Sequence, residues 1–171
     1  MDKVLIDRIE ANRKEYERLL KDEHYSYVRF NPKNGALCAI HKQHQFDPKI
    51  GKFGIPRGDY EKISLEVLYK EGNKIILGSE KSEYKVKMHD GILNNIRIDI
   101  KGVEGVGENN ILNDIKDANK KRVESIVFYY HHKEVFHKKS LVSSYESYLR
   151  NSKSKRIKEI YYIVDEKLHK L

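Results

Sequence analysis

Short apolar segments of strand length alternate with longer amphipathic segments from about residue 60 to the end of the chain, and this order constrains the fold most. Three strand-like segments follow one another, after which helices and strands alternate. That order predicts an α+β fold with a mixed β-sheet flanked by helices. The expected sequence of elements is helix, strand, strand, strand, helix, strand, helix and strand, at 59–71, 74–78, 83–89, 96–102, 109–121, 125–130, 140–150 and 157–164.

The first 58 residues show a different pattern. Apolar residues at helical spacing over 2–21 predict an amphipathic helix, and "YSYVRF" and "ALCAI" flank the turn sequence "NPKNG", which predicts a hairpin. Residues 41–59 hold two prolines and three glycines without periodicity, and a connection this long is usually functional or disordered. We expect an N-terminal helix, hairpin and long loop over 1–58 and an α/β core over 59–171, most simply within one compact domain.

Boundary signals refine the core. Asp59 is placed to cap the first core helix and Gly72 to end it. The segment "DGILNN" at 90–95 is interpreted as the connection between two strands.

The chain is basic, with 34 Lys and Arg against 26 Asp and Glu, a net charge of +8. Clustered cations favour a polyanionic partner because they release counterions when they contact phosphates. A lysine-rich surface that serves solubility is the alternative. The densest basic stretch, "NSKSKRIK" at 151–158, is suited to phosphate contacts or to a solvated loop.

Cysteine content and hydropathy exclude several classes of protein. The single cysteine, Cys38, excludes an internal disulfide framework and a zinc site of several cysteines, and its apolar neighbours indicate a buried packing role. No apolar stretch approaches the roughly 18 residues of a membrane span, and the N-terminus lacks a signal-peptide pattern. We therefore expect a cytoplasmic site of action and no membrane partner.

Strand alternation in "IRIDIKG" places isoleucines on one face and Arg97, Asp99 and Lys101 on the other. If the segment 90–95 brings Asp90 beside them, two carboxylates and an ammonium group converge at one sheet edge. Such a group suits phosphodiester cleavage, because carboxylates hold a divalent metal such as Mg²⁺ while lysine offsets negative charge in the transition state. Charges alternating by chance on an outward strand face are the alternative explanation.

A helix glutamate, Glu61 or Glu66, would complete this group. The order of helix, strand, strand with Asp90 and strand with Asp99-x-Lys101 resembles the core of the PD-(D/E)xK nucleases. This resemblance implies that Asp90 and Asp99 are metal ligands. The chain departs from the pattern in having His89 rather than proline before Asp90, and in using aspartate as the third-strand acid.

A second resemblance covers residues from about 60 to 168. The segments "EGNKIIL", "HDGILNNIRIDIKGVEG", "NNILNDIKDA", "ESIVFYYHHK" and "IKEIYYIV" resemble the C-terminal toxin domains of contact-dependent inhibition proteins of the CdiA type. They are also similar to nuclease-like domains of phages and mobile elements of bacteria in the barnase–EndoU–colicin–RelE group. The preceding segment "NPKNGALCAIHKQHQFDP" resembles the N-terminal extension of the mobile-element forms. The resemblance implies an RNA-cleaving enzyme, often directed at tRNA, with an immunity protein as partner.

The two resemblances imply different chemistry. Metal-independent ribonucleases deprotonate the 2′-hydroxyl and stabilise the cyclising phosphate with side chains on a sheet surface. Candidates for these substrate contacts are His41, His44, Arg57 and Tyr162, together with Lys101. Where the toxin pattern leads us to expect a histidine after the helix-ending glycine, this chain has Asn73.

The spacing of His41 and His44 also permits a metal on a helical turn, but no third ligand is identifiable nearby in the sequence, so zinc is not predicted. The sequence as a whole predicts a nuclease with Asp90, Asp99, Lys101 and Glu61 at its centre, acting on RNA in preference to DNA. A non-catalytic module that binds nucleic acid or protein with the same fold is the alternative.

Overall fold

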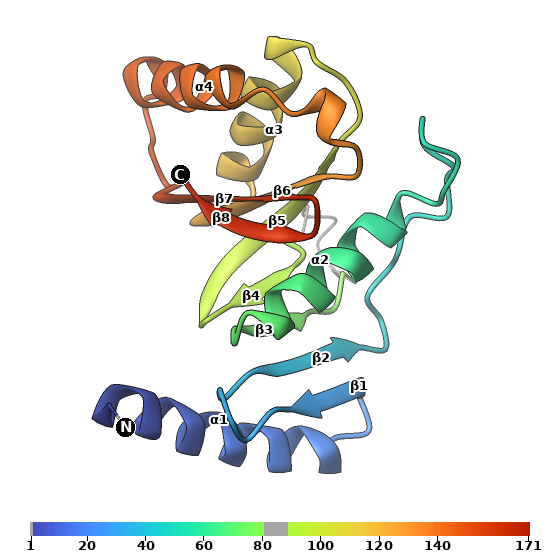
Figure 1. The fold of residues 1–171 in the computed structure, drawn as a ribbon, viewed down its shortest axis with the longest axis vertical. Helices are drawn as coiled ribbons and strands as arrows, with labels where there is room; N and C mark the ends of the chain where they lie inside the picture. The colour runs from blue at the N-terminus through green and yellow to red at the C-terminus, as the bar shows by residue number, and fades with distance from the viewer. Residues whose placement is uncertain (1, 81–88) are drawn as a thin grey trace.

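In the computed structural model, residues 2–80 and 89–171 are described, and they form one eight-stranded mixed sheet with four α-helices (Figure 1). The α+β fold expected from the sequence is therefore confirmed. The strands are β1 (Tyr25–Phe30), β2 (Leu37–His41), β3 (Lys74–Leu77), β4 (Gly91–Leu93), β5 (Ile96–Val103), β6 (Ser125–Tyr130), β7 (Glu159–Val164) and β8 (Lys167–Lys170). The helices are α1 (Lys3–Lys21), α2 (Gly58–Lys70), α3 (Glu108–Lys120) and α4 (Lys138–Asn151), with a 3₁₀ turn at Lys133–Val135.

The strands lie side by side in the order of the chain, from β1 to β8. Pairs β2–β3, β5–β6 and β6–β7 are parallel, and the other neighbouring pairs are antiparallel. Strands β2, β3, β5, β6 and β7 consequently run in one direction and point their carboxyl ends to the same edge of the sheet.

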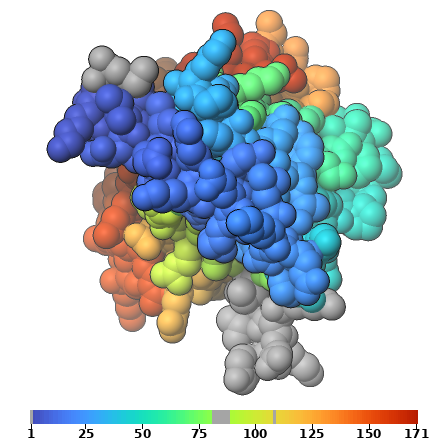
Figure 2. Space-filling model, turned by 90° about the horizontal axis from the view of Figure 1, so that it is seen from below, coloured from blue at the N-terminus to red at the C-terminus, as the bar shows by residue number. Residues whose placement is uncertain are grey.

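Helices cover both faces of the sheet. Ile98 and Ile100 of β5 pack in the cluster formed with α2, whereas Ile126 and Phe128 of β6 pack with α3 and α4 on the opposite face. The amphipathic helix α1 lies on this second face, where Leu19 contacts residues of β2 and β3. Figure 2 shows α1 and the β1–β2 hairpin together forming a broad surface at the lower end of the molecule.

The N-terminal helix is fixed at its start and along its length by polar contacts. The Asp2 carboxylate accepts a hydrogen bond from the Val4 backbone N–H at 3.0 Å. A salt bridge of 2.6 Å joins the Lys74 ammonium, on β3, to the Glu15 carboxylate of α1. Through β2–β3 pairing and this contact, the first 58 residues share a sheet with the rest of the chain.

Several boundaries differ from the expected ones. Helix α2 begins at Gly58, so Asp59 lies in the first turn instead of capping it. The segment 90–95 contains strand β4, and the turn is confined to Asn94 and Asn95, whose φ angles of 50° and 72° suit a tight hairpin. Asparagine tolerates this backbone region, so the Asn-Asn pair marks a two-residue turn.

Two further differences concern strands. The strand expected at 83–89 lies outside the described residues except for His89, which belongs to no regular element. Strand β8 was not expected, because its residues are mostly polar and exposed and carry no apolar alternation. It pairs with β7 across a turn at Asp165 and Glu166, which adopt φ angles of 51° and 57°.

Gly91 allows the close approach of β3 and β4. A Cβ at this position would clash with the backbone carbonyl oxygen of Ile76. We expect Gly91→Ala to lower the free energy of unfolding by about 3 kcal/mol, measured by urea denaturation, because the strands must separate. Gly78→Ala is the matched control, since a Cβ there meets nothing within 4 Å; equal losses in both variants would contradict the steric explanation.

Candidate active site

A cleft of about 320 Å³ opens at the edge to which the parallel strands point their carboxyl ends. The first turn of α2, the segments that follow β2 and β3, and the carboxyl-terminal half of β5 meet there. Ligands in open α/β sheets commonly bind at this edge. Its lining includes Arg57, Tyr60, Glu61, Glu80, Lys101 and Glu104.

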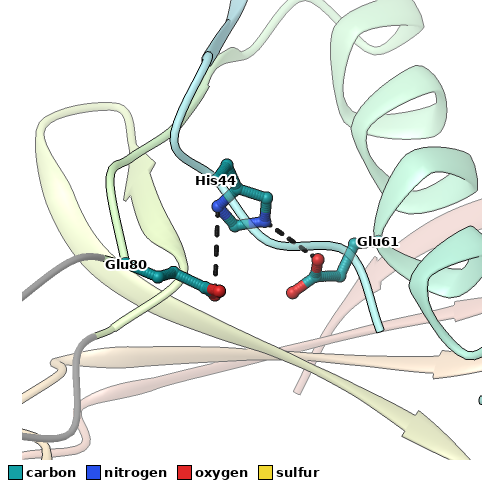
Figure 3. Close-up of side chains that lie close together, drawn as sticks. All are labelled: His44, Glu61 and Glu80. Carbon is teal, nitrogen blue, oxygen red and sulfur yellow. Dashed lines mark hydrogen bonds and ion pairs between the residues drawn. The ribbon is translucent and has the colours of Figure 1, made fainter. Parts of the chain in front are cut away.

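His44, Glu61 and Glu80 converge beside this cleft (Figure 3). The His44 ring is fully buried, with its Nε2 3.0 Å from a Glu61 carboxylate oxygen and its Nδ1 2.8 Å from the Gly78 carbonyl oxygen. A Glu80 oxygen lies 3.9 Å from the same Nδ1. One ligand atom from each of the three side chains lies within 4.8 Å of the others, so the group can hold a metal ion.

The carboxylates dominate the electrostatics of this group. Burial alone would lower the pKa of His44, but the hydrogen bond and negative charge of Glu61 outweigh it and raise that pKa. Burial, reinforced by the charge of Glu61, raises the pKa of Glu80. A nearby cation therefore stabilises the ionised carboxylates, and protonated His44 supplies one.

Asp90 immediately precedes β4, beside the part of β5 that extends beyond its pairing with β4. Its carboxylate accepts a hydrogen bond of 2.6 Å from the backbone N–H of Ile100, a residue that lies beyond the described β4–β5 pairing. Its own backbone N–H donates to an Asp99 carboxylate oxygen at 3.2 Å. Burial, followed by the negative charges of Glu61 and Asp99, raises the pKa of Asp90 well above its usual range.

Asp99 lies on the opposite face of β5 from the isoleucines, as alternation predicted, but this face is covered. The side chain is fully buried, because α3 packs over it. One Asp99 oxygen lies 3.1 Å from the Lys121 ammonium and 3.7 Å from the Lys101 ammonium. An outward, solvated strand face therefore does not explain the charge of Asp99.

Lys101 bridges the buried acids and the cleft. Its ammonium is 2.9 Å from an Asp117 oxygen on α3, while the residue also lines the cleft with Glu61. Burial alone would lower the pKa of Lys101, but the charges of Asp99 and Asp117 raise it, so the side chain stays positive. Asp114 on α3 is close by, and burial raises its pKa to about 6.

Four predicted residues are thus joined in one contiguous set. Glu61 and Asp99 interact electrostatically with Asp90, and Asp99 is paired with Lys101. Glu66, the other helix acid considered, points to a different place, where Arg29 and Tyr27 bind it. Between the two helix acids, the structure brings only Glu61 into the set.

The other predicted contacts divide into two groups. His44 belongs to the carboxylate group, and Arg57 lines the cleft with its guanidinium 2.8 Å from Glu104. His41 instead packs against the rings of His24 and Tyr25. Tyr162 is buried and stacks between Phe136 and His169 in the core beneath α3 and α4.

Sequence reasoning missed Glu80 and Lys121. Glu80 follows β3 with no motif around it, and Lys121 is one of several lysines at the end of α3. It also found no third metal ligand for His44, because Glu61 and Glu80 are 17 and 36 residues away and meet it only in the folded chain. The one sequence signal for Lys121 is its position at the end of the helix that follows the strand carrying Asp99.

No protein-family model matches the sequence, and no curated protein matches it. Among solved structures, a chain of the "CdiA-CT/CdiI toxin and immunity complex from Burkholderia pseudomallei" is similar, with a TM-score of 0.55 and 14% identity. The similarity covers 77% of this chain and 97% of that one, and at this identity it shows the fold alone. Across the described residues, no helix has the length and apolar character required to cross a membrane.

Proposed function

We propose that this chain is a nuclease that hydrolyses phosphodiester bonds at the site formed by Glu61, Asp90, Asp99 and Lys101. The observation that carries the proposal is their convergence at one sheet edge. The Asp90 backbone N–H contacts the Asp99 carboxylate, Lys101 pairs with Asp99, and Lys101 lines the open cleft together with Glu61. Similarity of fold to a chain of a toxin and immunity complex supports a toxin-like role.

The residues present fit a divalent cation. Asp90 is buried among other acids and its pKa is strongly raised, so a cation is needed to keep all of them ionised. Asp90 and Asp99 are the proposed ligands, with Glu61 and Glu80 contributing further oxygens of the kind that Mg²⁺ prefers. In its neutral form, with Nδ1–H donating to the Gly78 carbonyl, His44 adds a nitrogen donor at Nε2 that Mn²⁺ accepts more readily than Mg²⁺, so metal binding would release the His44 proton.

When bound, a divalent ion polarises a phosphate oxygen and lowers the pKa of a coordinated water. The chain's own residues supply the rest. Lys101, held positive by the acids around it, offsets negative charge on the phosphate. The Gly78 carbonyl and Glu61 hold the His44 ring in place, and Arg57 presents a guanidinium to the cleft.

A metal-independent mechanism has less support. It requires several histidines, tyrosines and basic residues on one exposed sheet surface. His41 and Tyr162 pack against other rings, away from the cleft lining, and His44 is buried between Gly78 and Glu61. The carboxylate site is therefore the better candidate.

RNA is the preferred substrate in this proposal, on the strength of the resemblance to CdiA-type toxin domains. The same resemblance, together with the presence of an immunity protein in the similar complex, supports an immunity protein as partner. The proposed site of action is the cytoplasm, where RNA is abundant.

Incubation with total RNA and plasmid DNA, in Mg²⁺ or in EDTA, tests the proposal. We expect cleavage in Mg²⁺ only, and a loss of at least about hundredfold in Asp99→Asn. Asp7→Asn, which changes an exposed carboxylate on α1, is the control. Cleavage that persists in EDTA would contradict the metal site, and binding without any cleavage would favour the non-catalytic module.

A further inference from the structure

A basic groove lies at the edge of the sheet where β5, β6 and β7 begin, opposite the edge of the cleft. It encloses about 440 Å³, more than the cleft does. Arg97 is the second residue of β5, and Glu124 and Lys158 each precede a strand by one residue. The groove is lined by Arg97, Arg122, Glu124, Lys155, Arg156 and Lys158, which are five cations and one carboxylate.

The positive charge of this groove is largely unneutralised. Arg97 lies 4.0 Å from Glu124, at the limit of an ion pair. Within residues 2–80 and 89–171, no carboxylate comes within that distance of the other four cations, Arg122, Lys155, Arg156 and Lys158. Concentrated charge of one sign in a concave surface attracts polyanions.

The basic segment that lines the groove is held in place. The Asn119 side chain accepts a hydrogen bond from the Arg156 backbone N–H at 2.9 Å and donates one to the Ser154 carbonyl oxygen at 2.9 Å. The buried Tyr148 hydroxyl accepts a bond from the Ile157 N–H and donates to the same Asn119. These contacts fix the backbone of a segment that the sequence alone left open as a solvated loop.

The groove reaches toward the proposed active site. Arg97 and Asp99 lie on the same face of β5, two residues or about 7 Å apart. Lys121, which contacts Asp99, immediately precedes Arg122 of the groove. Positive groups therefore extend from the groove to the buried acid of the site.

We propose that this groove binds the phosphodiester backbone of a nucleic acid while another part of the same strand enters the cleft at the opposite edge of the sheet. The inference rests on the proposed nuclease function for its choice of partner. Guanidinium and ammonium donors match phosphate oxygens and give little base specificity. The groove and the cleft lie at opposite edges of the sheet, and only a long polyanion can occupy both, which favours a nucleic acid strand over an acidic protein.

Fluorescence anisotropy of short labelled RNA and of labelled double-stranded DNA measures this binding. The protein carries Glu61→Gln, and EDTA is present, so that substrate survives. Arg122→Gln, Lys155→Gln, Arg156→Gln and Lys158→Gln are combined in one variant. The matched control removes two arginines and two lysines from the exposed side of α1, with Arg13, Lys14, Arg18 and Lys21 changed to Gln.

The groove variant is expected to bind RNA at least about tenfold more weakly, with the salt slope of log affinity reduced by about 3 between about 50 and 200 mM salt. The α1 control is expected to change that slope by less than about 1. Equal losses in both variants would overturn the inference, because net charge alone would then explain binding. Unchanged nucleic-acid affinity with lost binding to polyglutamate would also overturn it, in favour of an acidic protein partner.

The same experiment separates the two proposals. Cleavage by the unchanged protein in Mg²⁺ is scored in parallel. If the protein binds RNA through the groove but does not cleave it, the groove proposal stands and the nuclease proposal fails. If the protein cleaves RNA equally well with and without the groove cations, the nuclease proposal stands and the groove proposal fails.

Discussion

Asp90→Asn is expected to abolish cleavage while leaving the protein at least as stable as before at neutral pH in EDTA. Burial, followed by the charges of Glu61 and Asp99, raises the pKa of Asp90, so ionising this carboxyl in the folded chain without a cation is unfavourable, and the neutral asparagine side chain has nearly the same shape. The amide oxygen can still accept the hydrogen bond from Ile100. Each kcal/mol of unfavourable burial and charge repulsion that the substitution removes raises the Tm by about 2–4 °C.

The pH dependence of stability follows from the direction of this shift. A carboxyl whose pKa is higher in the folded than in the unfolded chain makes the folded chain bind more protons. Its stabilising contribution is present below the ordinary aspartate pKa of about 3.9 and is lost as pH rises above it. Thermal unfolding from acidic to neutral pH in EDTA should therefore show a shallower decline for Asp90→Asn than for the unchanged protein.

Divalent metal should reverse the comparison. Mg²⁺ or Mn²⁺ is expected to raise the Tm of the unchanged protein and to have a much smaller effect on Asp90→Asn, because binding to the folded state alone stabilises it. Asp7→Asn should behave as the unchanged protein in every condition. An equal response of Asp90→Asn to metal would remove Asp90 from the ligand set.

Lys101→Met is expected to lower the free energy of unfolding by about 2–3 kcal/mol and to reduce cleavage by at least about hundredfold. Asp99 is fully buried, and without Lys101 the one ammonium group that still contacts it within residues 2–80 and 89–171 is that of Lys121. We expect this loss in the free energy of unfolding to be smaller than the about 3–5 kcal/mol typical of a broken buried ion pair, because Lys121 still contacts Asp99. Urea denaturation and the RNA cleavage assay measure the two effects.

A second variant separates charge balance from catalysis. Adding Asp99→Asn to Lys101→Met removes the buried charge that lost its partner, so part of the stability should return while activity stays absent. Lys116→Met, on the exposed side of α3, is the control and should change stability by less than about 0.5 kcal/mol. No recovery in the double variant would show that Lys101 acts through packing instead.

The sequence could predict the parts of this molecule that repeat a simple period. Isoleucines alternating in β5 and apolar residues at helical spacing in α1 and α3 are local signals, and these three predicted elements are present. Strand β8 escaped prediction because pairing with β7 holds it, with little apolar burial of its own.

The candidate site divides in the same way. Asp90, Asp99 and Lys101 lie within 12 consecutive residues, so a strand pattern and a short connection were enough to suggest their proximity. His44, Glu80 and Lys121 come from three distant segments and meet the site only through the order of strands in the sheet. The sequence does not determine on which face of the sheet the Tyr162 side chain lies. It packs in the core because α3 and α4 cover its face.

The agreement between strand order in space and strand order in the chain has a consequence for how the molecule comes apart. Each of the strands β2 to β8 pairs with the strand immediately before it in the chain, so no pairing in the described sheet skips a strand. Such a sheet can be unzipped from either terminus one strand at a time and rebuilt by successive addition at the growing edge. Closing the loop between consecutive strands costs less chain entropy than pairing strands that are far apart in the sequence, so this sheet should refold faster than one with the same strands in a permuted order.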